Sequence, residues 1–354
     1  MKKRLFALLA ASALLLAGCS TLLERDLSQV DPHNTAPTTE GDPSILRADS
    51  YQELVNALIY LVGAGAESGT IRLYTDAEDV ETFLSDACLE VVQEDPLGAY
   101  CVEYIKYSVD PVLTYFQAQV QITYRRTREQ VSSIVQATGV TAIRSELESA
   151  LSSFASERVL RISYFEGDEA VIQDLARQAY YATPASALGM PQVSVSIYPD
   201  NGRQRIVEIL LDYPLELSEL EARRERLDRE LERLAQRLSS QTDPPGPLDA
   251  ASTLLREGSW DPQGGSAPCD LFDTGAANSE GLSLAFSALC QRLGLPCRTA
   301  QGERQGEPHF WNVVQTGEGW RHLDLTAEEP DLYTDQQLLE LGYIWEEDAL
   351  PLCP

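Results

Sequence analysis

The sequence predicts an α+β protein, and three observations support this fold class. Residues 115–124 alternate between apolar and glutamine side chains, which is the period of a half-buried antiparallel strand. The same succession of helix, strand, helix and two strands is expected twice, once around Arg72 and once around Arg161. Residues 275–326 then combine an apolar helix with three strands. We therefore expect two αβαββ repeats, a long helix and a final α+β domain.

Residues 1–19 have the features of an export signal. Lys2, Lys3 and Arg4 precede an apolar stretch that is too short for a stable membrane span. The sequence Leu-Ala-Gly-Cys that ends at Cys19 resembles a bacterial lipobox, which implies that Cys19 becomes a lipidated N-terminus. We therefore expect an extracytoplasmic protein held by lipid on the outer face of the cell membrane. The alternative is a plain secretory signal.

The segment that follows, residues 20–49, is polar and contains three prolines. Such a composition is typical of a flexible tether, and we interpret it as one. The alternative is an ordered arm that lies on the first domain.

The two repeats are predicted at residues 50–127 and 143–215. In the first we expect helices at 51–62 and 78–92 and strands at 70–74, 99–108 and 115–124. In the second we expect helices at 143–154 and 169–181 and strands at 159–165, 192–197 and 205–213. Neither repeat contains a histidine, and their acidic residues fall mostly on solvated helix faces. A spacer role is therefore weighed against recognition of a surface polymer or partner.

Residues 217–240 are predicted to form a charged helix with a narrow stripe of leucines. The stripe spans fewer than three heptads, so we favour a helix docked on its own chain over a coiled-coil dimer, and the oligomeric state stays open. The sequence Gln-Thr-Asp-Pro-Pro-Gly-Pro at 241–247 breaks this helix. It marks the boundary of a final domain at 248–354.

Three residues of the final domain have the order of a nucleophile, a base and an orienting acid. Ser279 opens the apolar helix, His309 opens a strand, and Asp324 lies in the next strand. In catalytic triads the base takes the proton of the nucleophile while the acid orients the base. We therefore expect the Ser279 side chain to face His309, and His309 to face Asp324.

At these residues the chain resembles the transglutaminase-like superfamily, whose members share a papain-like Cys-His-Asp arrangement. The positions that match are Gly275, Gly281, His309, Trp311, Asn312, His322, Asp324 and Thr326, and residues 333–353 resemble the tail of many bacterial members. The resemblance implies that Ser279, His309 and Asp324 occupy the catalytic positions. It also leads us to assign Trp311 and Asn312 to ligand binding.

The position of the nucleophile holds Ser279 where the family has cysteine. A thiol has a pKa of about 8.5 and a histidine can hold it as thiolate, whereas a hydroxyl must lose its proton during the attack. We therefore expect a catalytically impaired pseudoenzyme that binds peptide or cell-wall material. The alternatives are a Ser-dependent amidase or peptidase, and a structural spacer at the cell surface.

The chain contains 55 acidic and 27 basic residues and has a net charge of −28. Nucleic acids are bound by basic surfaces, so we expect no nucleic-acid partner. The chain has only three histidines and no C-x-x-C pair, so we predict no metal and no cofactor.

Besides Cys19, six cysteines are present, and an even number in an exported protein permits disulfides. The pairings considered are Cys88 with Cys101, Cys290 with Cys297 and Cys269 with Cys353. The alternative is six buried free thiols.

Overall fold

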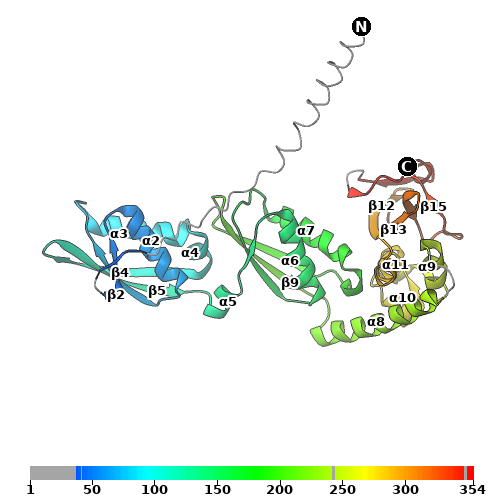
Figure 1. Ribbon diagram of the computed structural model, residues 1–354, viewed down its shortest axis with the longest axis horizontal. Helices are drawn as coiled ribbons and strands as arrows, with labels where there is room; N and C mark the ends of the chain where they lie inside the picture. The colour runs from blue at the N-terminus through cyan, green and yellow to red at the C-terminus, as the bar shows by residue number, and fades with distance from the viewer. Residues whose placement is uncertain (1–36, 41, 241–243, 347–348) are drawn as a thin grey trace, which may run out of the picture. The chain divides into compact units, whose positions relative to one another are not determined.

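The computed structural model describes residues 37–40, 42–240, 244–346 and 349–354. The chain divides into two compact units, and both contain helices and strands, which confirms the predicted α+β class (Figure 1). The first unit contains the described residues as far as Val92 together with Glu103–Thr123; the remaining described residues belong to the second. The predicted signal at 1–19, its lipidation site Cys19, and residues 20–36 of the predicted tether lie outside the described residues.

The first unit is built on a five-stranded sheet. Its elements are β1 (Thr39–Glu40), β2 (Asp42–Ala48), α2 (Tyr51–Gly63), β3 (Ser68–Leu73), α3 (Val80–Gln93), β4 (Val102–Val112) and β5 (Tyr115–Tyr124). The strand order is β1-β2-β3-β5-β4, with β2 parallel to β3 and β3 antiparallel to β5. Ala118, Val120 and Ile122 on one face of β5 are buried, as the alternation in the sequence requires.

Two predicted segments differ from the structure in this region. Residues 42–48 of the expected tether form β2, because Leu46 and Ala48 are buried in the first core and the backbone pairs with β3. The strand expected at 99–108 begins only at Val102, after the helix α4 (Pro96–Cys101). Asp95 caps this helix by accepting the Gly98 N–H at 2.8 Å, and its first residue is proline, so the local sequence favours a helix start.

The second repeat begins the second unit. Its elements are α5 (Arg128–Ser132), β6 (Val135–Ala137), α6 (Val140–Ser152), β7 (Glu157–Ile162), α7 (Glu169–Ala182), the 3₁₀ turn η1 (Pro184–Ser186), β8 (Gln192–Tyr198) and β9 (Arg205–Asp212). The sheet order β6-β7-β9-β8 matches the order β2-β3-β5-β4 of the first unit. The predicted αβαββ succession is thus preceded by β1 and β2 in the first sheet and by β6 in the second. In the second repeat this strand has three residues, which is too short to produce a periodic pattern.

The chain ends in an α+β domain around the buried helix α11. Its elements are α8 (Leu217–Ser239), α9 (Pro247–Leu254), β10 (Ser259–Gly265), α10 (Asp270–Thr274), β11 (Ala276–Ala277), α11 (Ser279–Leu293), β12 (Cys297–Arg304), β13 (Glu307–Thr316), β14 (Gly319–Leu323), β15 (Leu332–Tyr333), α12 (Asp335–Glu340) and β16 (Tyr343–Trp345). The sheet has the order β15-β14-β13-β12-β16 and is antiparallel throughout. Residues 281–290 of α11 are all buried, and the helix contacts both the sheet and the helices α8 and α9.

Helix α8 packs on its own chain. The leucines of its stripe join one core with residues of α9 and α11. Arg292 of α11 forms ion pairs with Asp228 and Glu232 on the neighbouring face of α8. The helix predicted at 217–240 is therefore packed into the final domain. Among the described residues, no helix has both the length and the apolar character needed to cross a bilayer.

The cysteines of the described residues are all free thiols, so none of the expected disulfides is present in this structure. Cys88 and Cys101 illustrate the reason. Cys88 lies in α3 of the first unit, whereas Cys101 lies in α4, which belongs to the second. Burial raises the pKa of each thiol to about 12, which makes both unreactive near neutral pH.

The packing of α8 leads to a stability prediction. Leu231 is 0% exposed in the core shared with α9 and α11, so Leu231→Ala should lower the free energy of unfolding by about 2–5 kcal/mol. Denaturant unfolding followed by circular dichroism measures this change. The matched control is Arg229→Ala on the exposed face of α8, which should be nearly neutral. A Leu231→Ala variant as stable as the control would contradict the docked arrangement.

Candidate functional site

Ser279 is the first residue of α11, and the preceding loop fixes its position. Asn278 caps the helix by accepting the Gly281 N–H at 3.0 Å, and its own N–H donates to the carbonyl of Gly265. A Cβ atom added to Gly281 would lie 2.6 Å from that same carbonyl oxygen, so the close approach requires glycine. The Ser279 side chain is thereby held at the positive end of the helix dipole.

His309 and Asp324 are brought together by adjacent strands. His309 lies in β13 and Asp324 directly follows β14, and the two side chains are 7% and 1% exposed. His309 Nε2 lies 2.8 Å from Asp324 Oδ2, within hydrogen-bonding distance. This contact is the geometry expected of a base and its orienting acid.

Further donors surround the Asp324 carboxylate. Tyr343 donates its hydroxyl to Oδ2 at 2.5 Å, and Thr326 donates its hydroxyl to Oδ2 at 3.0 Å and its N–H to Oδ1 at 2.8 Å. Arg304 Nη1 lies 3.5 Å from Oδ2. Burial acts to raise the pKa of Asp324, but the hydrogen bonds and charge of its neighbours outweigh it and hold the pKa below its usual value. Asp324 is therefore a carboxylate at neutral pH.

Ser279 lies beside this pair without being bonded to it. Its Oγ accepts the backbone N–H of Phe310, the residue after His309, at 3.4 Å. No hydrogen bond joins Ser279 to His309 among the described residues. The structure thus places Ser279 next to the start of β13, where its Oγ is bonded to the backbone.

One side of the site is covered by the second repeat. Tyr181 of α7 donates its hydroxyl to Glu280 at 3.0 Å, although 99 residues separate the two. The Tyr181 ring also contacts the Phe310 ring, with centroids 5.6 Å apart. Burial raises the pKa of Glu280, and the Tyr181 hydrogen bond only partly opposes that shift. Residues flanking both Ser279 and His309 are therefore held by a helix that the sequence does not associate with the site.

Trp311 and Asn312, which were predicted to bind ligand, are instead fully buried. Asn312 donates to the carbonyl of Ser283 and to the hydroxyl of Ser287, which connects β13 to α11. Trp311 packs on the other face of the sheet, and its indole N–H donates to His322. These two side chains support the site from within the core and present no surface to a ligand.

The second histidine of the domain, His322, belongs to a separate cluster. His322, Asp335 and Cys353 have ligand atoms within 4.8 Å of one another, as a metal site requires. However, His322 Nδ1 accepts the Trp311 indole N–H at 2.9 Å, so the ring proton must be on Nε2, which bonds Asp335 at 2.8 Å. Neither nitrogen offers a free lone pair to a cation. The cluster is therefore held together by hydrogen bonds, and Asp335 also accepts the backbone N–H of Cys353 at 2.8 Å. We call Trp311, His322, Asp335 and Cys353 the clamp.

Tyr343 contacts Asp324 but was not predicted as a site residue. The one sequence feature that could have indicated it is its position in residues 333–353, the tail that resembles bacterial family members. Arg304 and Tyr181 have no comparable signal. Arg304 lies in the strand β12 and Tyr181 in the amphipathic helix α7, and the sequence of each element indicates only its secondary structure.

The clamp leads to a prediction for pH dependence. Burial lowers the pKa of His322 from 6.5, and protonation of Nδ1 would also place its N–H against that of Trp311. As the pH falls through 6.5, the unfolded chain therefore binds a proton that the folded chain does not. The free energy of unfolding should decrease from pH 7 downward, by up to about 1.4 kcal/mol per pH unit from this residue.

Comparison with His322→Gln tests this assignment. Denaturant unfolding of both proteins between pH 7 and pH 5.5 should give a shallower pH slope for the variant, whatever its absolute stability. Equal slopes would show that His322 takes up its proton equally in the folded and unfolded chains.

The final domain can be compared with known proteins. Residues 232–325 match the model of the transglutaminase-like superfamily. The matched segment begins within α8. No curated protein matches the chain.

Solved structures give weaker likenesses. A proposed cysteine protease from Cytophaga hutchinsonii is 10% identical with a TM-score of 0.27, over 44% of this chain and 66% of that one. A TGase is 12% identical with a TM-score of 0.26, over 59% of this chain and 61% of that one. Calcium-bound LapG from Legionella pneumophila is 15% identical with a TM-score of 0.21, over 37% of this chain and 80% of that one. This chain thus covers less than two thirds of the first two. The family match, together with the arrangement of Ser279, His309 and Asp324, identifies a transglutaminase-like domain in the final part of the chain.

Proposed function

We propose that this protein is an extracytoplasmic lipoprotein whose transglutaminase-like domain binds peptide or cell-wall material and is impaired as a catalyst. The observation that carries the proposal is the state of Ser279. A hydroxyl stands where the family has a thiol, and this hydroxyl is hydrogen-bonded to the Phe310 N–H rather than to His309. A poorly acidic group without a bonded base is a weak nucleophile.

The surroundings of Asp324 support impairment for an electrostatic reason. During attack by Ser279, His309 would take up a proton and become an imidazolium, which the acid must stabilise. Asp324 already accepts hydrogen bonds from Tyr343 and Thr326, and Arg304 places a positive charge 3.5 Å from the same oxygen. That charge disfavours a second cation at His309.

Aromatic side chains near Ser279 support a binding role. Trp260 is 45% exposed in β10 and pairs in register with Ala277, two residues before Ser279. Phe310 and Tyr181 lie beside the start of β13. Aromatic surface next to the N–H groups of a helix start suits a peptide, which has apolar side chains and carbonyl oxygens to bind.

A second candidate function is a Ser-dependent amidase or peptidase. It is favoured by the hydrogen bond between His309 Nε2 and Asp324, which leaves Nδ1 without a hydrogen-bond partner among the described residues. A small movement that brings Ser279 Oγ to Nδ1 would complete a triad. Labelling by a serine-reactive fluorophosphonate, with Ser279→Ala as control, separates this candidate from the impaired domain.

The preferred function predicts the behaviour of Ser279→Cys. A thiol at the start of α11 should have a lowered pKa because the helix dipole favours the thiolate and His309 offers a nearby base for its proton. Iodoacetamide should label residue 279 about tenfold faster than a free thiol at pH 7. Mass spectrometry of the peptide that contains residue 279 separates this label from the native thiols.

The control for this experiment is His309→Ala in the Ser279→Cys background, which should remove most of the rate advantage. Wild-type protein should be slow or silent toward ester and peptide substrates. Turnover of an ester that is abolished by Ser279→Ala would replace the preferred function with the hydrolase. Labelling of Ser279→Cys at the rate of a free thiol would show that catalytic geometry is lost as well.

The proposed anchor predicts that Cys19→Ala releases the protein from the membrane. The basic start and the Leu-Ala-Gly-Cys sequence motivate this expectation. Cell fractionation with labelled palmitate measures both location and lipid, and Ser20→Ala is the matched control. A Cys19→Ala variant that stays in the membrane fraction with its lipid would rule the assignment out.

A further inference from the structure

We propose that the second repeat has a separate binding site, which takes an extended basic peptide as a fifth strand in the groove between α7 and β8. None of the residues that line this site belongs to the candidate site around Ser279, and the proposal does not depend on the function proposed for that site.

The first observation is the open edge of the sheet. In the order β6-β7-β9-β8, the strand β8 pairs with β9 alone among the strands of the described residues. The Leu211 N–H of β9 points away from β8, to the carbonyl of Ser156, so its opposite residue Val193 directs its backbone groups outward. The same alternation directs the backbone groups of Val195 and Ile197 outward.

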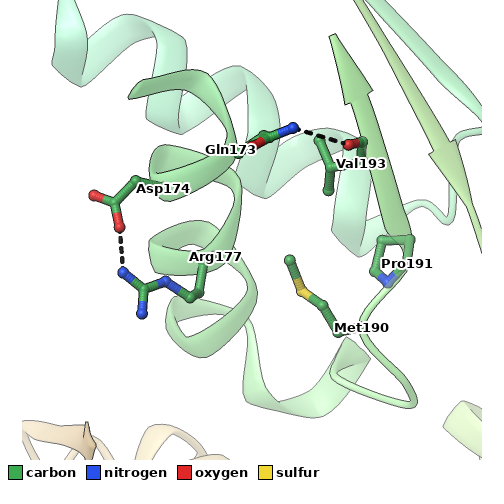
Figure 2. A pocket seen from close by; sticks show the side chains of 6 residues that line it. All are labelled: Gln173, Asp174, Arg177, Met190, Pro191 and Val193. Atoms are coloured by element: carbon green, nitrogen blue, oxygen red, sulfur yellow. Dashed lines mark hydrogen bonds and ion pairs between the residues drawn. The ribbon is translucent and has the colours of Figure 1, made fainter. Parts of the chain in front are cut away.

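A side chain already occupies one of these outward positions. Gln173 of α7 donates its amide to the Val193 carbonyl at 3.4 Å, as Figure 2 shows. The contact is long and Gln173 is exposed. Its amide stands where the N–H of an added strand would bind, and an added strand can displace it at little cost.

The second observation is a continuous groove beside this edge. One cavity of about 380 Å³ lies between α7 and the start of β8 and is lined by Gln173, Met190, Pro191 and Val193, among others (Figure 2). A second, of about 530 Å³, continues past Gln173 to Ile197. Strand addition uses main-chain hydrogen bonds for affinity and such cavities for alternate side chains. The seven residues of β8 match a peptide of similar length.

The third observation is the charge of the groove, which selects the occupant. Asp168, Glu169 and Asp200 line the second cavity with a single cation, Arg205. Arg205 donates to the carbonyls of Gly202 and Pro199, so its hydrogen bonds are directed to the hairpin turn. Glu169 and Asp200 form no side-chain hydrogen bond or ion pair with the described residues. A lysine side chain at this end of the peptide would therefore meet uncompensated carboxylates.

Strand geometry fixes which backbone groups of the peptide matter. Directly opposite residues of an antiparallel pair point to the same face of the sheet. The side chains of Val193, Val195 and Ile197 point to the core shared with α7. The peptide residues whose N–H groups face β8 are therefore those whose side chains enter the groove.

The probe for the test is an acetylated peptide, Lys-Thr-Val-Thr-Val-Thr-Val-amide, titrated into the purified full chain by calorimetry. Its valines are meant for the groove and its lysine for the end beside Asp200. Two modified probes carry N-methyl groups on the valine amides or on the threonine amides. Methylation at valine should abolish binding, and methylation at threonine should leave it within about threefold, because only the first set faces β8.

The charge is tested in the protein. The double variant Glu169→Gln and Asp200→Asn should weaken binding of the lysine probe about tenfold and leave a norleucine probe unchanged. The matched control is Glu221→Gln with Glu225→Gln on α8, which changes the net charge equally and should have no effect.

Hydrogen exchange locates the bound peptide. The amides of Val195 and Ile197 should exchange more slowly with the probe bound, while those of α11 should not change. No saturable binding, equal loss with both methylated probes, or protection at α11 in place of β8 would each overturn the proposal.

Discussion

The burial of a charged carboxylate at Asp324 constrains the final domain more than any other interaction. An ion removed from water must be compensated by donors, and here they come from separate parts of the chain: His309 in β13, Thr326 after β14, and Tyr343 in β16. The three strands must therefore keep one register for the charge to be tolerated. The base of the candidate triad is held in place by the same compensation, whether or not the site is catalytic.

This constraint gives a structural reason for the pairing of His309 with Asp324 that does not depend on catalysis. The contact between His309 and Asp324 contributes to folding, so its retention does not require selection for chemistry. The contact with Ser279 contributes nothing comparable, since that hydroxyl bonds a backbone N–H instead. Replacing a residue that compensates a buried charge lowers the free energy of unfolding, whereas replacing the nucleophile leaves no buried charge without a partner.

The second repeat is structurally continuous with the domain that it precedes. Leu284 of α11 lies in the core of the repeat, and Phe154 and Leu188 of the repeat lie in the core around α8 and α11. Tyr181 extends this contact to the edge of the site. A repeat packed in this way does more than lengthen the molecule. Tyr181 of α7 contacts residues beside Ser279, and the cavities between α7 and β8 lie in the same compact unit.

Sequence alone determined the features that depend on neighbouring residues. The α+β class, the buried helix α11, the alternation of β5 and the order of Ser279, His309 and Asp324 follow from short-range periodicity and motif spacing. Tertiary structure decided what depends on distant contacts. It placed β2 and β6 in the sheets, left Cys88 and Cys101 as free thiols, buried Trp311, and brought Tyr181 to Glu280. None of these has a local pattern, because the free energy that stabilises each one comes from burial against residues far away in the chain.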